Sequence, residues 1–296
     1  MEGSIFLQAV IAGVLMGGVF AIIALGLSII WGVMEIVNFA HGDFMMVAMF
    51  LTLGLFQYLG LIPIFSLPIT AAVLFGLGIL TYRLIIRPVI KAPMVAQIVV
   101  TFGLLLFMRN MGQFIFKADF RTLPAKAATL NGWLSGSIKV YGLMIPPQKL
   151  VAFILSLVFI ILVDQFFKRT NVGMALRATA QNRVAAQLVG VDIDWMYSLS
   201  WGLGILCVGI GGVLLSLFHF IHPEVGLVFT LFSFIIVTLG GFGSIWGAFA
   251  GGLIIGLAES MGGLYIAPAY KFAVAFIIFI VVLFLRPQGL FGGSKA

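Results

Sequence analysis

The stretch IVNFAHGD, residues 36–43, separates two long apolar runs near the start of the chain. It places three polar side chains, Asn38, His41 and Asp43, around Gly42, a residue type that interrupts helices. Polar groups and irregular backbone are costly in lipid, and they persist only where protein or a water-filled cavity surrounds them. We therefore expect a polar path through a bilayer, with these four residues along it.

The composition excludes a soluble globular protein. The chain is 62% hydrophobic and 8% charged, and its mean hydropathy is +1.24. A soluble protein of 296 residues cannot hide that much apolar surface. The apolar runs are long enough for helices that span a bilayer, which need roughly 20 residues each, and they lack the alternation expected of an outer-membrane barrel. The predicted fold class is an all-α polytopic membrane protein.

Nine apolar runs follow one another along the chain. They cover residues 5–31, 43–61, 64–86, 94–116, 150–167, 196–221, 225–242, 245–263 and 268–285. Because one or two of them are expected to be half-helices, we predict a bundle of about eight transmembrane helices. Discontinuous segments are expected at 31–43 and 240–247, where glycines interrupt the apolar sequence. The whole chain, 1–296, is expected to form a single transmembrane domain.

Basic residues gather between the apolar runs, so the net charge of +7 is interpreted as a topology signal. The segments 83–91 and 168–183 and the tail with Arg286 and Lys295 are expected on the cytoplasmic side. The alternation of spans then forces 117–149 to the periplasmic side, although this loop is also basic. The side of the N-terminus is left open, and the first span is expected to be retained rather than cleaved as a signal peptide.

Glycines recur every four residues in two parts of the chain. They are Gly13 and Gly17 in the first run, and Gly243, Gly247, Gly251, Gly252 and Gly256 near the end. Small residues at this spacing allow two helices to approach closely, so helix packing is expected here. A sharper interpretation is that these helices slide past one another during a transport cycle.

The hydrophilic segment 171–192 is rich in helix-forming residues. Asn171 is expected to cap the helix at its start, and Gly190 to end it in a left-handed turn. A helix this short is marginal alone, so we expect it to dock against another surface through small residues. The alternative is a helix that lies on lipid headgroups, held by Arg177 and Arg183.

Four blocks of sequence spread over nearly the whole chain point to one family. They are residues 26–44, 173–186, 238–251 and 286–292. Together they resemble the branched-chain amino acid permease family of bacterial ABC importers, and most closely its smaller permease subunit. Ala185, Ala186 and Gly190 match the core of the coupling loop in such permeases, whereas Val184 stands where that pattern often has glutamate.

The resemblance implies a permease domain with several partners. A second homologous permease, two cytoplasmic ATPase subunits and a periplasmic binding protein that delivers leucine, isoleucine or valine would complete an importer in the bacterial inner membrane. On this resemblance the segment 171–192 is a cytoplasmic coupling helix. Its residues expected to transmit the ATPase signal are Gly173, Arg177, Ala185, Ala186 and Gly190.

Motifs for chemistry within this chain are not found. No GxxxxGKS or GxxxxGKT motif occurs, so ATP hydrolysis is left to partners, and the chain is expected not to be an enzyme. His219 and His222 with Glu224 are poorly spaced for zinc and are interpreted as a polar extracellular turn. The single cysteine, Cys207, is expected to be a packing residue. No cofactor or metal is expected.

Five ionisable residues are expected to lie within the membrane: Glu35, His41, Asp43, Arg109 and Glu259. Each either serves transport or fixes helix register through an ion pair, such as Arg109 with Glu259 or Asp43. The sequence leaves three alternative functions open. They are an ABC importer for urea or short amides, an ion-coupled secondary transporter that uses Asp43, Glu35 or Glu259, and a passive channel.

Overall fold

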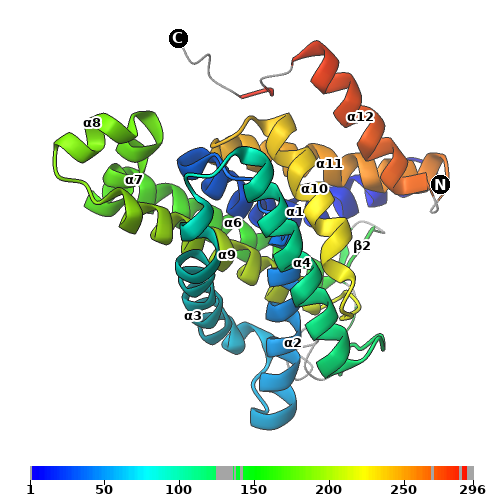
Figure 1. Ribbon diagram of the computed structural model, residues 1–296. Coiled ribbons are helices and arrows are strands. Elements are labelled where there is room, and N and C mark those ends of the chain that lie inside the picture. Colours follow the sequence, from blue (N-terminus) through cyan, green and yellow to red (C-terminus); the bar gives the residue numbers. More distant parts are fainter. Residues whose placement is uncertain are drawn as a thin grey trace.

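The computed structural model describes residues 2–124, 136, 138–140, 143–267, 270–286 and 289–291, and this part is almost wholly helical (Figure 1). The α-helices are α1 (Glu2–Met34), α2 (His41–Leu59), α3 (Pro63–Thr81), α4 (Met94–Phe116), α6 (Pro147–Arg169), α7 (Asn171–Gln181), α8 (Arg183–Leu188), α9 (Ile193–Ser216), α10 (Val225–Gly240), α11 (Ile245–Tyr265) and α12 (Lys271–Leu285). The remaining elements are a π-helical turn, η1 (Tyr82–Ile86), a 3₁₀ turn, η2 (Arg87–Val89), and an antiparallel hairpin of β1 (Ile138–Val140) and β2 (Leu143–Ile145). The predicted all-α polytopic fold is confirmed.

Every predicted apolar run forms a helix. Seven of the described helical segments are long and apolar enough to cross a membrane, and α3 does so together with η1 and η2. The other two runs form the shorter apolar helices α10, of 16 residues, and α12, of 15 residues. The expected discontinuities are also present, because α1 ends at Met34 and α2 begins at His41, and because α10 and α11 are separate helices.

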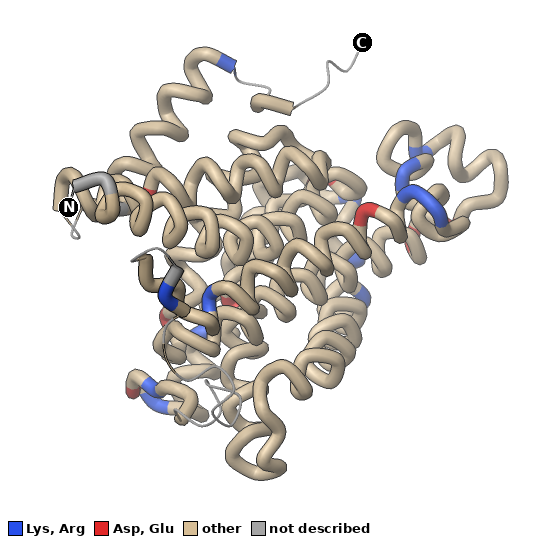
Figure 2. Tube along the Cα trace, turned by 180° about the vertical axis from the view of Figure 1, so that it is seen from behind, with Lys and Arg blue, Asp and Glu red and all other residues tan. Residues whose placement is uncertain are grey.

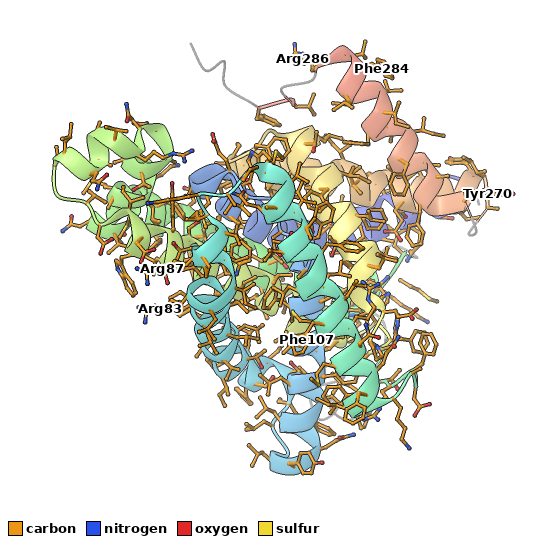
Figure 3. The ribbon with its side chains drawn as sticks, in the orientation of Figure 1. Arg83, Arg87, Phe107, Tyr270, Phe284 and Arg286 are labelled. Carbon is orange, nitrogen blue, oxygen red and sulfur yellow. The ribbon has the colours of Figure 1, made fainter. Side chains whose placement is uncertain are left out.

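The centre of the bundle is formed by α1 and α9. In their most apolar windows 72% and 83% of the residues are buried, against 17% for α4. The long α1 packs against α9 and α11, and also against α6 and α10. At the margin, α4 presents Phe107 away from the bundle, with 61% of that residue exposed (Figure 3). The peripheral helices therefore offer apolar surface to lipid or to another subunit.

Pairs of glycines make the helix crossings. A Cβ atom added to Gly13 would lie 2.8 Å from the carbonyl oxygen of Gly256, and one added to Gly17 would lie 2.8 Å from that of Gly252. These contacts join α1 to α11 backbone to backbone, which confirms the predicted packing role of the recurrent glycines. Whether these helices slide stays a prediction.

The loops divide between two ends of the bundle. At the α7–α8 end, Arg87 pairs with Asp194 at 3.0 Å, and the amide of Leu290 donates to the carbonyl of Leu239 at 2.7 Å. The described parts of 83–91, 168–183 and the C-terminal tail therefore share one end, as expected. Figure 2 shows charged residues gathered toward the two ends, with long uncharged helical stretches between them.

The opposite end, called the hairpin end here, holds β1, β2 and the N-terminus. The amide of Met144 donates to Oε1 of Gln8 at 3.0 Å, and Arg121 forms a backbone bridge with Ile221. The described residues of 117–149 thus lie opposite α7 and α8, as the alternation of spans predicted. Residues 125–135, Pro287 and Lys295 lie outside the described part of the chain.

The expected single helix over 171–192 is wrong, because the structure breaks it at Asn182. The φ of Asn182 is −155°, and its Oδ1 accepts from the amide of Ala185 at 3.0 Å, so this side chain starts α8. The expected cap at Asn171 is also wrong: Oγ1 of Thr170 accepts from the amide of Gly173 at 3.0 Å. Gly190 has the predicted left-handed conformation, with φ of 88°.

Candidate functional site

A re-entrant connection between α1 and α2 forms the candidate site. Glu35 adopts a φ of 58°, a conformation that is uncommon for a residue with a side chain, and it reverses the chain at the end of α1. At the start of α2, Nε2 of His41 donates to the carbonyl of Ile23 at 2.8 Å. Ile23 lies roughly 16 Å before the end of α1 along its axis. The helix α2 therefore begins deep inside the bundle.

The four residues predicted for the path lie close together and are buried. Asn38, His41 and Asp43 are each 0% exposed. Oδ1 of Asn38 accepts from the amide of Ala40 at 3.1 Å, and the amide of Gly42 donates to Oγ1 of Thr230 at 2.9 Å. The structure thus places them in one polar cluster, called the central cluster here, where α2 crosses α10.

An ion pair links the central cluster to α4. Nε of Arg109 lies 3.5 Å from Oδ1 of Asp43, and the Arg109 side chain is 17% exposed. Of the two partners expected for Arg109, Asp43 rather than Glu259 makes this pair. Asp43 also lies in the first turn of α2, where a negative charge is favourable because of the helix dipole.

Two cavities approach the central cluster from opposite ends. The hairpin-end cavity, of about 490 Å³, reaches Phe20 on α1, and the α7–α8-end cavity, of about 430 Å³, reaches Ser28. His41 contacts Ile23, which lies between these two positions along α1. The central cluster lines neither cavity, so in this conformation it lies in a closed region between them.

Two further polar residues contribute to the central cluster or to a cavity, and the sequence did not indicate either role. Thr230 of α10 binds the amide of Gly42, and Lys149 of α6 lines the hairpin-end cavity. Thr230 could have been noticed as a polar residue inside an apolar run. Lys149 carries no such signal, because it stands at the edge of a basic loop.

Glu35 does not lie inside the membrane region as expected. Its side chain is 51% exposed at the α7–α8 end, and Oε2 accepts from Nη2 of Arg183 at 3.1 Å. The reason is that α1 continues to Met34, three residues beyond the apolar run, and carries Glu35 out of the core. Glu259, by contrast, is half-buried on α11 and lines the hairpin-end cavity.

The residues expected to couple to an ATPase divide into two groups. Arg177, Ala185 and Gly190 are exposed. Gly173 packs on the end of α6, where an added Cβ would lie 2.3 Å from the carbonyl oxygen of Phe166, and Ala186 is 3% exposed. Gly173 and Ala186 therefore hold the segment to its own chain.

The exposed face of α8 is apolar, and it differs from the expected face of small residues. Val184 is 67% exposed, Leu188 is 83% exposed and Val189 is 79% exposed. These branched side chains, with Ala185, form what we call the α8 face. Figure 1 shows α8 projecting from the margin of the bundle.

A multi-pass helical bundle with a discontinuous helix at its centre and a helical segment projecting from one end is typical of membrane transport permeases. The model of one family, the branched-chain amino acid transport system permease component, matches residues 9–283. The chain belongs to this family.

Individual relatives agree over nearly their whole length. The permease protein LivH of Salmonella typhimurium is 30% identical over 297 residues, which cover 97% of this chain and 96% of that protein. LivH of Escherichia coli K12 is 29% identical and BraD of Pseudomonas aeruginosa is 26% identical, with the same coverage. Each is named as a permease protein of a high-affinity branched-chain amino acid transport system. A solved structure of PsaBC from Streptococcus pneumoniae in complex with Fab, at 15% identity and a TM-score of 0.44, covers 97% of this chain and 92% of that chain and is too distant to carry an argument.

Proposed function

We propose that this chain is the permease subunit of an ATP-driven importer of branched-chain amino acids in the bacterial inner membrane. It would form half of the translocation path together with a second homologous permease. Of two cytoplasmic ATPase subunits, one would dock on α7 and α8 of this chain and the other on the second permease, and a periplasmic binding protein would deliver the solute. Residues 1–296 would form one permease domain. The observation that carries the proposal is the α8 face.

The α8 face supports docking of a protein partner. Two branched apolar side chains are exposed on α8 and a third, Val189, on the residue that follows it, and exposed apolar groups of this kind mark interaction surfaces. They stand at the end where basic residues concentrate, which the positive-inside rule assigns to the cytoplasm. Because the sequence holds no phosphate-binding motif of its own, an ATPase is the partner that an importer needs there.

An ion pair connects this docking surface to the central cluster. Arg183 is the first residue of α8, and it pairs with Glu35 at 3.1 Å. Glu35 immediately precedes the connection that leads to Asn38 and His41. A displacement of α8 by an ATPase would therefore pull on the connection, and a shift of the central cluster would open the closed region between the two cavities.

The ion-coupled alternative is less well supported. A carboxylate that carries protons or sodium must release its counter-charge during the cycle, whereas Asp43 pairs with Arg109 and Glu35 pairs with Arg183. Each carboxylate therefore already has an arginine, a permanently charged residue, as its partner. The names of the relatives favour branched-chain amino acids over urea or short amides, and they describe a transport system rather than a passive channel.

Uptake and co-purification test the proposal together. In membrane vesicles that contain the chain and its genomic partners, leucine uptake should require ATP and should persist when ion gradients are collapsed.

L188D should abolish co-purification of the ATPase while the amount of folded permease stays the same, because Leu188 contributes nothing to the core. Y58D is the matched control, since Tyr58 is 87% exposed at the hairpin end. Retained ATPase binding in both L188D and V184D would refute docking on the α8 face.

The Glu35–Arg183 link has its own test. R183E should leave the ATPase bound but should lower uptake per ATP hydrolysed. The charge-swapped E35R/R183E variant should recover part of the lost uptake. Both side chains are more than half exposed, so the thermal midpoint should barely change. Equal transport by R183E and the parent chain would show that the signal takes another route.

A further inference from the structure

The hairpin-end cavity has the size and lining of a site for a small organic molecule. Its volume of about 490 Å³ falls within the range of roughly 300–1,000 Å³ that is typical of such sites. It lies between α1, α10, α11 and α12, and the connection from α9 to α10 closes its rim. It opens at the end opposite α7 and α8, which is the side from which an importer takes its solute.

The floor of this cavity is aromatic. Phe20, Phe229 and Phe232 are 2%, 5% and 2% exposed. The ring of Phe20 lies 5.9 Å from that of Phe229 and 5.1 Å from that of Phe232, and Phe272 extends the cluster at 5.2 Å from Phe232. Such a floor favours an aliphatic side chain, because moving methylene groups out of water onto an apolar surface is favourable.

The walls of the cavity carry charges of both signs. Lys149 projects from the first turn of α6, with Nζ 5.6 Å from the centre of the Phe218 ring. Glu259 lines the wall from α11, and Glu224 lies at the rim, where Nε2 of Gln113 donates to it at 3.1 Å. A cation and a carboxylate thus face one cavity above the aromatic floor.

His222, at the rim, adds no positive charge to this pattern at neutral pH. Burial, helped by the neighbouring His219, lowers the pKa of His222, although Glu224 opposes the shift. A histidine with a lowered pKa is neutral at pH 7. Among the described residues that line the cavity, Lys149 is the one lysine or arginine, and Glu259 is the half-buried carboxylate, whereas Glu224 is exposed.

We propose that the hairpin-end cavity binds a zwitterionic α-amino acid with an apolar side chain, with Lys149 on its carboxylate, Glu259 on its ammonium group and the phenylalanine floor on its side chain. This assignment rests on the proposed import of amino acids, and it adds the residues that recognise the solute within the membrane domain. A zwitterion loses its hydration on entry, and only paired charges on the protein offset that cost. An amine or a fatty acid would leave one wall charge without a ligand partner.

A single introduced cysteine can report occupancy of the cavity. The only native cysteine, Cys207, is buried, so a maleimide should react with A12C, whose residue lines the cavity, and not with the parent chain. The experiment uses membranes that contain the chain with its partner subunits. Millimolar leucine should slow labelling of A12C and leave labelling of the control Y58C unchanged. Two partial ligands, 4-methylpentanoate and 3-methylbutylamine, should protect far less.

Two charge variants complete the test. K149M and E259Q, each in the A12C background, should raise the leucine concentration that gives half-protection by about tenfold or more, the effect expected from losing one charge-assisted hydrogen bond. Equal protection by leucine and both partial ligands, or unchanged protection in both variants, would overturn the assignment. If leucine protects but uptake does not need ATP, the site stands and the proposed ATP-driven import fails. If uptake needs ATP but leucine never protects A12C, the import stands and this site fails.

Discussion

At the scale of single residues, Asp43 shows how a charge is kept inside an apolar bundle. Its side chain is 0% exposed, and the partner that compensates it, Arg109, comes from a helix at the margin. Taking both charges out of water is costly, and their attraction offsets that cost only while both are present. The pair therefore fixes α4 against the start of α2 more than it adds net stability.

Removing Arg109 alone should be strongly destabilising. R109M leaves the Asp43 carboxylate buried without its cation, which typically costs about 3–5 kcal/mol, so the thermal midpoint of the purified protein should fall clearly. The double variant D43N/R109M should recover most of the loss, because no unpaired charge remains. The control R177M changes an exposed arginine and should leave the thermal midpoint unchanged. An unchanged midpoint for R109M would mean that Asp43 is not buried as described.

Some of these residue roles could be predicted and others could not. Asn38, His41 and Asp43 stand out in the sequence because polar residues inside apolar runs are rare. The choice between Asp43 and Glu259 as the partner of Arg109 could not be made, because it depends on which helices are neighbours. The predicted position of Glu35 was also wrong, because the point where an apolar run stops does not fix where a helix ends.

At the scale of elements, glycine contacts decide where helices cross. The first turn of α2 meets the first turn of α10 at Gly42 and Gly226, and a Cβ atom added to Gly42 would lie 2.0 Å from the carbonyl oxygen of Gly226. Backbone atoms on both sides leave no flexible side chain that can give way. This crossing therefore holds the central cluster in place.

A matched pair of substitutions in α2 tests the crossing. G42A should prevent normal folding or lower the thermal midpoint sharply, because α2 and α10 must separate to accept a methyl group. G54A, in the same helix, meets nothing within 4 Å and should be neutral or slightly stabilising. Folded yield and thermal unfolding of the two variants are the measurement. Similar behaviour of G42A and G54A would exclude the close α2–α10 contact.

The α7–α8 segment shows which features of an element the sequence pattern predicts and which it misses. Helix-forming composition predicted one helix, and the left-handed turn at Gly190 was predicted correctly. The break at Asn182 was missed, because an asparagine side chain competes for backbone donors only when the surrounding packing permits it. The same break turns Ala186 inward and exposes Val184, which the sequence did not indicate.

At the scale of the whole molecule, the two ends of the bundle must face opposite sides of the membrane. Cysteine labelling tests this, with buried Cys207 as a silent background. F120C, at the hairpin end, should react with an impermeant maleimide in spheroplasts, whereas Q181C, at the α7–α8 end, should react only after permeabilisation. Phe120 is 70% exposed, and Gln181 is also exposed, so access is not limited by packing. The reverse pattern would invert the proposed orientation of the importer.

The sequence by itself determined the class of fold, the nine apolar segments and the place of the central discontinuity. It did so because hydropathy and the cost of polar groups in lipid act locally along the chain. Only the tertiary structure decided which residues share a site. Lys149, Glu259 and Phe229 come from three helices far apart in sequence, and packing alone brings them around one cavity. Arg183 and Glu35 likewise meet only because the bundle places the end of α1 beside α8.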